Sequence, residues 1–225
     1  MAPVSIRPIP VRMQQHWTLL AVCLAALALP LSFSAGAVAV PVLARSAGAS
    51  PTALAWVTNA FMLTFGSLLL AAGGLADRYG QRRLFLLGTA GFTVATIVVC
   101  LAPTLLWLDL ARGLQGVAAA AALASGTAAL AHAWQGPVRA RVFALLGTTF
   151  GAGLALGPLL AGLLLHALGW RSVFAAGGVL TLAAFAVGAR ALPESHGERG
   201  RLDVGGMLGF SLMLAALTLA LLWLG

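Results

Sequence analysis

The chain consists of long apolar runs separated by short turns that carry most of its charge. A helix needs about 20 consecutive apolar residues to cross the hydrocarbon core of a bilayer. Seven runs of roughly this length lie at 17–43, 53–74, 84–102, 105–132, 142–166, 171–192 and 204–224. Only 8% of the residues are charged, against roughly 25% in a water-soluble domain. The sequence therefore predicts an all-α membrane protein and excludes a soluble enzyme.

Tryptophan and arginine mark the ends of these runs. Aromatic residues gather where a span meets the lipid headgroups, and all six Trp lie near a predicted span end: Trp17, Trp56, Trp107, Trp134, Trp170 and Trp223. If the N-terminus is cytoplasmic, ten of the 13 arginines lie inside, Arg45 and Arg171 lie outside, and Arg112 lies within a span. The positive-inside rule then predicts a multi-pass protein of the cell inner membrane with a cytoplasmic N-terminus.

Polar stretches divide the chain into four predicted segments. Residues 1–16 form a cytoplasmic leader, 17–192 a six-helix bundle, 193–203 a cytoplasmic linker and 204–225 a seventh transmembrane helix. A cleaved secretory signal is the alternative for the first run, because a basic stretch precedes it. The run from 19 to 44 is longer than the roughly 7–15 apolar residues of a signal, so we expect a retained helix.

The segment 73–83 joins the second and third runs and reads GGLADRYGQRR. It combines an Asp at a helix end, small residues that permit close helix approach, and arginines at fixed offsets from the Asp. Charge pairs in a half-wet interface are weak, so such a cluster can exchange partners as helices move. A plain basic turn is the alternative. We expect a conformational switch formed by Gly73, Asp77, Arg78, Gly80, Arg82 and Arg83.

The fourth run contains an arginine, Arg112, three residues after Asp109. An arginine at the centre of a spanning helix costs at least roughly 2.5–3.5 kcal/mol, so we expect it to face a cavity or a partner. A separation of three residues is one helical turn, so we expect Asp109 and Arg112 to pair along the helix. The alternative is an arginine that extends to the headgroups beside a headgroup-level Asp.

The fifth run carries small residues at four-residue intervals. Small faces let helix backbones approach closely in lipid, and a proline without an amide proton should bend the helix. General helix packing is the alternative to a functional motif here. The residues concerned are Gly147, Gly151, Gly153, Gly157, Pro158, Ala161 and Gly162.

Other chemistry is not indicated. The chain has no nucleotide-binding loop, no nucleophile with a base, and no His or Cys at metal-ligand spacing. It also lacks the Lys-rich tail or basic, aromatic-interleaved face that nucleic-acid binding requires. We therefore expect no enzyme activity, no cofactor, no metal and no nucleic-acid partner.

Three of these segments resemble motifs of the major facilitator superfamily. Segment 73–83 is similar to its signature cytoplasmic loop, and Arg112-Gly-Leu-Gln-Gly is similar to its fourth-helix motif, whose arginine the resemblance implicates in proton transfer. Gly153, Gly157, Pro158 and Gly162 resemble the antiporter motif of drug-exporting members, which favours export over uptake. Residues 54–57, 169–171 and 203–206 look like the fourteen-helix drug:proton antiporter branch.

The same resemblance implies a half-bundle of two inverted three-helix repeats. The sequence contains a matching pattern, because five residues recur 89 positions later with the same spacing and one replacement. Gly73, Leu75, Asp77, Gly80 and Arg82 correspond to Gly162, Leu164, His166, Gly169 and Arg171. We expect the two copies to lie at opposite faces of the membrane.

The chain departs from the family pattern at positions that matter for proton coupling. Gln81 stands where the signature loop usually has Arg, and Ser32 stands where the branch usually has an Asp in the first span. Asp109 is then the only carboxylate within the spans that could carry protons, so Asp109 and Arg112 are the candidates for coupling. We expect Ser32, Asn59 and Gln115 to line a substrate cavity.

The resemblance implies the N-terminal part of a secondary active transporter that exports amphipathic or drug-like small molecules against proton entry. Such a transporter binds its substrate between two halves, and this chain predicts one half and one further helix. Its expected partners are the lipid bilayer, the small-molecule substrate, protons, and a C-terminal half or second chain. The alternative is a truncated, non-transporting membrane remnant or an assembly partner.

Overall fold

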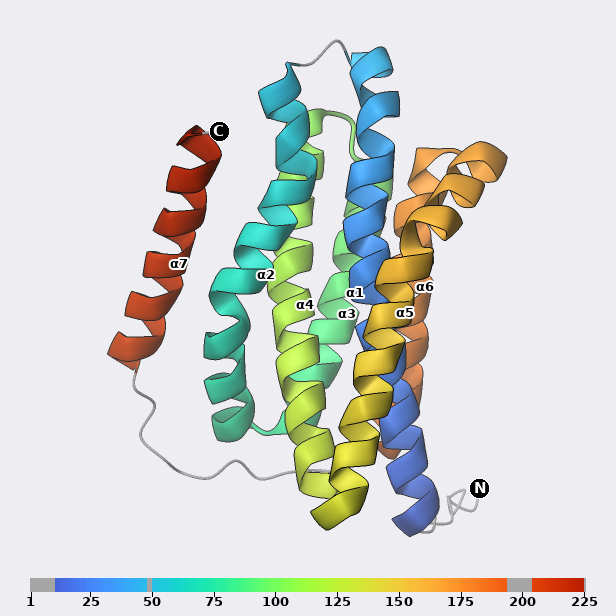
Figure 1. The fold of residues 1–225 in the computed structure, drawn as a ribbon, viewed down its shortest axis with the longest axis vertical. Coiled ribbons are helices and arrows are strands. Elements are labelled where there is room, and N and C mark those ends of the chain that lie inside the picture. Colours follow the sequence, from blue (N-terminus) through green and yellow to red (C-terminus); the bar gives the residue numbers. More distant parts are fainter. Residues whose placement is uncertain (1–10, 48–49, 194–203, 225) are drawn as a thin grey trace, which may run out of the picture.

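The computed structural model describes residues 11–47, 50–193 and 204–224, and within these ranges it contains helices and no strands (Figure 1). Six helices are long and apolar enough to cross a membrane, whereas the apolar stretch Gly205–Ala220 of the seventh is shorter. The predicted six-helix bundle with an additional helix is confirmed. The helices are α1 (Val11–Ala47), α2 (Pro51–Tyr79), α3 (Gln81–Leu101), α4 (Leu105–Ala133), α5 (Gly136–Leu168), α6 (Trp170–Ala191) and α7 (Val204–Leu224).

Local signals explain where two of the helices begin. Ser50 precedes α2, and its hydroxyl accepts a hydrogen bond from the Ala53 amide at 3.3 Å. Pro51 follows at the first helical position, where a missing amide proton costs nothing. Thr104 caps α4 in the same way through the Trp107 amide at 3.5 Å. Such caps satisfy amide donors that have no partner within the helix.

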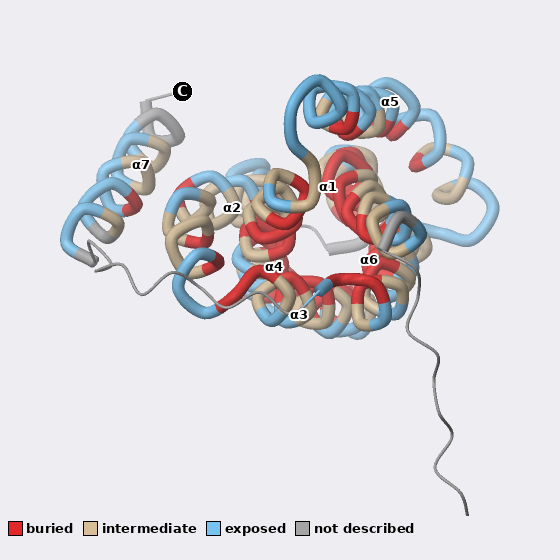
Figure 2. The backbone as a smooth tube through the Cα atoms, turned by 90° about the horizontal axis from the view of Figure 1, so that it is seen from below, coloured by how far each residue is buried: buried red, intermediate tan, exposed pale blue. Residues whose placement is uncertain are grey.

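The bundle is organised around α1 and α4. Helix α4 packs against α2 and α3, and α1 packs in the same manner against α5 and α6. Contacts between α3 and α6 join the two groups, while α7 lies outside the bundle beside α2. Figure 2 shows that buried residues concentrate on the faces of these helices that turn toward one another. The outer faces carry the exposed apolar side chains that a lipid environment requires.

In each three-helix repeat, α1–α3 and α4–α6, a single glycine forms the turn between the second and the third helix. Gly80 separates α2 from α3 with φ 95°, and Gly169 separates α5 from α6 with φ 81°. Residues other than glycine rarely adopt this backbone region. The two turns lie at opposite ends of the bundle (Figure 1). This arrangement confirms the inverted repeat predicted from the sequence.

Two arginines at equivalent positions of the repeat join α3 to α6 at both ends. Arg82 Nη2 donates to the Ala189 carbonyl oxygen near the end of α6 at 2.9 Å, and Arg171 Nε donates to the Cys100 carbonyl oxygen near the end of α3 at 2.8 Å. The last carbonyl oxygens of a helix have no amide donor within that helix, and they carry partial negative charge. Each arginine therefore satisfies a carbonyl of the opposite helix.

Candidate functional site

A fully buried arginine lies in the interior of the bundle. Arg112 on α4 is 0% exposed, and its Nε donates a hydrogen bond to the Val57 carbonyl oxygen on α2 at 2.9 Å. Its Nη1 donates to Gln115 Oε1 at 2.6 Å and to the Ser32 hydroxyl at 3.4 Å, and its Nη2 donates to the Ser32 carbonyl oxygen at 3.2 Å. The guanidinium thereby ties α4 to α1 and α2.

Two phenylalanine rings complete the surroundings of this guanidinium. The carbon at its centre lies 4.4 Å from the ring centre of Phe61 on α2 and 5.4 Å from that of Phe174 on α6. Both rings are fully buried. A desolvated cation over an aromatic face gains about 2 kcal/mol or more. The groups in direct contact with the Arg112 guanidinium are therefore carbonyls, an amide, a hydroxyl and aromatic faces, and no carboxylate of the described residues forms an ion pair with it.

The hydrogen-bond network continues from Arg112 to α3. Gln115 accepts from Arg112 and donates from Nε2 to Thr96 Oγ1 at 2.7 Å, and Thr96 donates in turn to the Phe92 carbonyl oxygen at 2.8 Å. Each side chain in this series of hydrogen bonds donates to an acceptor, as buried polar groups require. Helices α1, α2, α3, α4 and α6 meet at this network, so its geometry depends on how they are packed.

Asp109 attracts Arg112 through space, but the two form no hydrogen bond or ion pair among the described residues, and their pairing along the helix stays a prediction. The guanidinium points into the bundle, where Ser32, Val57 and Gln115 take its protons. Asp109 Oδ1 is buried and has no hydrogen-bond partner in the described part of the chain. A separation of one turn permits contact but does not enforce it. Here the inward acceptors hold the arginine instead.

The three residues expected to line a cavity lie at different depths. Ser32 is 1% exposed and Gln115 is 0% exposed, and both contact Arg112 in the closed interior. Asn59 is half-buried on α2. In this conformation Ser32 and Gln115 therefore hold the arginine in place and do not face open space. That these three residues line a substrate cavity stays a prediction.

The segment expected to act as a switch is mostly helical, because α2 extends to Tyr79 and α3 begins at Gln81. Asp77, Arg78 and Arg83 are exposed, while Arg82 turns toward α6. Within the described ranges Asp77 forms no ion pair with these arginines. The expected charge cluster is thus not assembled here, since Arg82 bonds the Ala189 carbonyl and the other charges point to the surroundings. Gly73 lies half-buried in the same stretch, with open space beside it.

Gln81, which replaces an arginine of the family pattern, has a specific partner on α4. Its Nε2 lies 2.8 Å from Nδ1 of His132, and the Gln81 side chain is buried. The contact joins the first turn of α3 to the last turn of α4. An uncharged side chain suits this buried position, where an unpaired guanidinium would pay a desolvation cost.

The glycine motif of α5 brings this helix close to α1. A methyl group at Gly153 would lie 2.6 Å from Cγ of Pro30, and one at Gly157 would lie 2.5 Å from the Ser34 hydroxyl. Neither position has room for a side chain. Gly162 has nothing within 4 Å of such a group, so it does not contribute to this packing. Pro158 lies inside the helix, and α5 bends in its second half (Figure 1), as a proline causes.

Comparison with known proteins identifies the family. The sequence profile described as Major Facilitator Superfamily matches residues 22–225. The chain therefore belongs to the major facilitator superfamily of membrane transporters, in agreement with the motifs, the six spanning helices and the inverted repeat.

The curated relatives include antibiotic-resistance and efflux proteins. The puromycin resistance protein pur8 of Streptomyces alboniger is 37% identical over 198 residues, which cover 87% of this chain and 39% of the relative. The multidrug efflux pump LfrA of Mycolicibacterium smegmatis is 35% identical over 181 residues, which cover 78% of this chain and 36% of the relative. The methylenomycin A resistance protein of Bacillus subtilis is 34% identical over 174 residues, which cover 77% of this chain and 37% of the relative. The chain thus matches less than two fifths of each relative.

The fold also matches a solved transporter. The crystal structure of the peptide transporter POT in complex with sulfate aligns with a TM-score of 0.71 over 93% of this chain and 45% of that protein, at 13% identity. The likeness concerns the fold, since so low an identity carries no functional detail.

Proposed function

We propose that this chain forms the N-terminal helix bundle of a secondary active transporter that exports amphipathic or drug-like small molecules. The observation that carries the proposal is the sealed Arg112 network, placed where five helices meet, in a chain whose relatives include antibiotic-resistance and efflux proteins. A second half, encoded by a longer form of the chain or by another chain, would supply the opposite wall of the substrate site. The N-terminus lies in the cytoplasm, as the arginine distribution favours.

Proton coupling rests on Asp109 in this proposal. Its buried, unpartnered Oδ1 is a carboxylate oxygen held away from water, and a charge there is costly in a membrane. Binding a proton removes that charge, one helical turn from Arg112. The guanidinium of Arg112 holds α1 and α2 against α4, so a change in charge at Asp109 would reach the helices that must move.

Asp77 has a different role. It is exposed at the end of α2 and has no ion-pair partner among the described residues, so it is available to a group from the second half. Contacts of this kind form and break as two halves rock around a central site. Gly73, Arg78, Gly80, Arg82 and Arg83 position the end of α2 for that contact. Gly153 and Gly157 shape the face of α5 that joins α1, Pro158 bends this helix, and Gly162 lies on a part of α5 that is open to the second half.

The test is drug efflux from cells that express the complete transporter. Asp109→Asn keeps the size of the side chain but cannot carry a proton, so we expect efflux to lose its dependence on the proton gradient while the amount of protein in the membrane stays the same. Asp77→Asn should slow turnover without changing which compounds bind. Proton-driven efflux that is undiminished in Asp109→Asn would remove this residue from the mechanism.

A further inference from the structure

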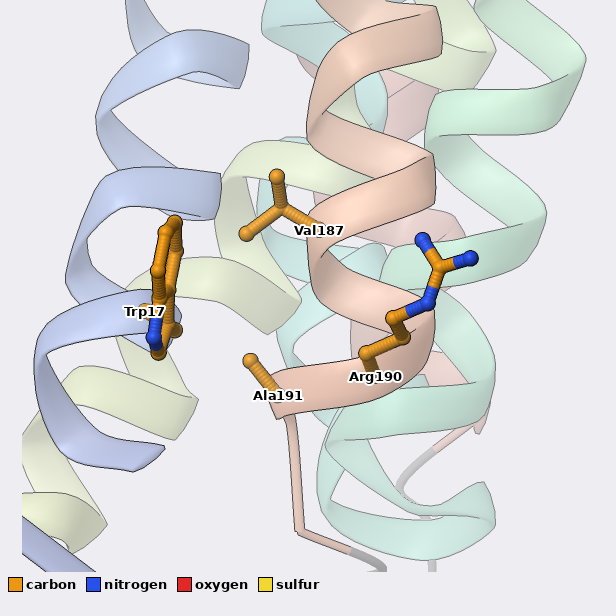
Figure 3. A pocket seen from close by; sticks show the side chains of 4 residues that line it. All are labelled: Trp17, Val187, Arg190 and Ala191. Carbon is orange, nitrogen blue, oxygen red and sulfur yellow. The ribbon is translucent and has the colours of Figure 1, made fainter. Parts of the chain in front are cut away.

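A groove lies between the second turn of α1 and the last turns of α6 (Figure 3). Its volume is about 340 Å³, and Trp17, Val187, Arg190 and Ala191 line it. Sites for small molecules begin at roughly 300 Å³, so the groove has room for part of a ligand. It lies at the end of the bundle where α1 begins and α6 ends (Figure 1).

Among the described residues that line the groove, the walls are apolar and the one charge is positive. Figure 3 shows the Trp17 indole on α1 facing Val187 and Ala191 across the groove. Trp17 is 42% exposed although it is a large aromatic residue. Tryptophan favours the level of the membrane where acyl chains meet headgroups. The groove therefore offers an apolar surface at that level, with a guanidinium on the adjoining turn.

The guanidinium of Arg190 is held weakly. The side chain is exposed and donates one long hydrogen bond, 3.5 Å from Nη1 to the carbonyl oxygen of Ala186 on its own helix. In Figure 3 it extends along α6, away from the indole. Arginine side chains on a membrane protein adjust their length and direction to reach polar groups. A rotation of this side chain would bring its charge to the rim of the groove.

The described part of this end of the bundle attracts anions. Among the residues whose side chains the structure describes, it carries one carboxylate, that of Asp77, against six arginines: Arg78, Arg82, Arg83, Arg139, Arg141 and Arg190. Anionic headgroups are drawn to such a basic membrane-proximal surface by about 1 kcal/mol for each basic residue near it. Charge complementarity therefore favours an anionic occupant.

We propose that this groove binds one anionic phospholipid, whose acyl chain lies against Trp17 and Val187 and whose phosphate contacts Arg190. A lipid satisfies both features of the groove, the apolar walls and the cation of Arg190, which reaches the rim by rotation of its side chain. An extended peptide would bring backbone amides and carbonyls that these apolar walls cannot satisfy. The occupant belongs to the leaflet on the side of the membrane where α1 begins.

The test uses the complete transporter in lipid nanodiscs made of phosphatidylcholine. A fixed fraction of the lipid is replaced by phosphatidylglycerol or phosphatidylcholine with brominated acyl chains, which quench tryptophan fluorescence on contact. The signal of Trp17 is the difference between the protein and its Trp17→Phe variant. We expect brominated phosphatidylglycerol to quench this signal more than brominated phosphatidylcholine at the same fraction.

Arg190→Gln should weaken the preference for phosphatidylglycerol about fivefold, because one basic residue near the surface contributes about 1 kcal/mol to the binding of anionic lipid. Arg190→Lys keeps the charge and should keep the preference. Arg83→Gln removes an exposed charge at the same end of the bundle but outside the groove, so it should leave the preference close to that of the unmodified protein. Equal quenching of the unmodified protein by the two lipids overturns the proposal without any Arg190 variant. An unchanged preference in Arg190→Gln overturns it as well.

Discussion

Arg112 donates two hydrogen bonds to Ser32, one to its hydroxyl and one to its carbonyl oxygen, and both residues are closed off from the surroundings. An uncharged residue thus faces the buried cation at a position where the related branch usually has an aspartate. The charge is compensated by neutral dipoles and aromatic rings, which bind it from α2 and α6 as well.

Removing the arginine should destabilise the bundle. Arg112→Ala leaves the carbonyls of Val57 and Ser32 and the amide of Gln115 without their donor, and each buried unsatisfied group costs about 1–3 kcal/mol. We expect a lower melting temperature in detergent and a loss of transport. Arg112→Lys retains the charge but cannot reach all the acceptors at once, so its melting temperature should fall between those of the other two proteins. A melting temperature of Arg112→Ala equal to that of the unmodified protein would contradict the structure.

A carboxylate at position 32 should capture the arginine. Ser32→Asp places an acid next to Nη1 and Nη2 of Arg112, and a buried ion pair with good geometry is hard to break. Because a protonated Asp loses most of this attraction, we expect transport by Ser32→Asp to show a second pH-dependent step in addition to any pH dependence of the unmodified protein. Ser32→Asn has nearly the same shape and no charge, so its pH profile should match that of the unmodified protein. Identical profiles for the Asp and Asn variants would exclude the interaction.

The contact between α5 and α1 should tolerate no side chain at two glycines. Gly153→Ala and Gly157→Ala each place a methyl group against Pro30 or Ser34, and overpacking costs about 1–3 kcal/mol. Gly162→Ala lies in open space on the same helix and is the matched control. We expect the first two variants to unfold at lower temperature than the third. Equal melting temperatures would show that α5 and α1 are further apart than described.

The two arginines that join α3 to α6 should have equal effects. Arg82→Gln and Arg171→Gln each remove a charge-assisted hydrogen bond to a helix-terminal carbonyl, worth about 1.5–3 kcal/mol. Thermal unfolding in detergent should show similar losses for both and little change for Arg83→Gln, whose side chain forms no hydrogen bond to another helix among the described residues. A loss of thermal stability in Arg82→Gln alone would indicate that the two equivalent hydrogen bonds of the repeat do not stabilise the bundle equally.

The sequence predicted those parts of the molecule that depend on pattern. Run length and tryptophan position indicated the helices, and the 89-residue spacing indicated the inverted repeat, because both follow from chain geometry alone. The surroundings of Arg112 could not be predicted. Nothing distinguishes Phe61 or Phe174 from other apolar positions in the sequence, and the backbone carbonyl of Val57 leaves no trace in it at all.

The direction of the Arg112 side chain, into the bundle and not toward Asp109, could not be predicted for the same reason. Spacing along one helix shows which side chains are neighbours, but the direction of a long side chain depends on acceptors contributed by other helices. Ser32 is 80 positions away from Arg112, and its approach is a product of tertiary packing.

The single-glycine turns at Gly80 and Gly169 have a mechanical consequence. A connector of one residue has no slack, so α2 cannot slide along α3, and α5 cannot slide along α6, without breaking the turn between them. The pairs α2–α3 and α5–α6 must therefore each move as a rigid unit. When this bundle rocks, the change occurs in the side-chain contacts between these units and not in the single-glycine connectors.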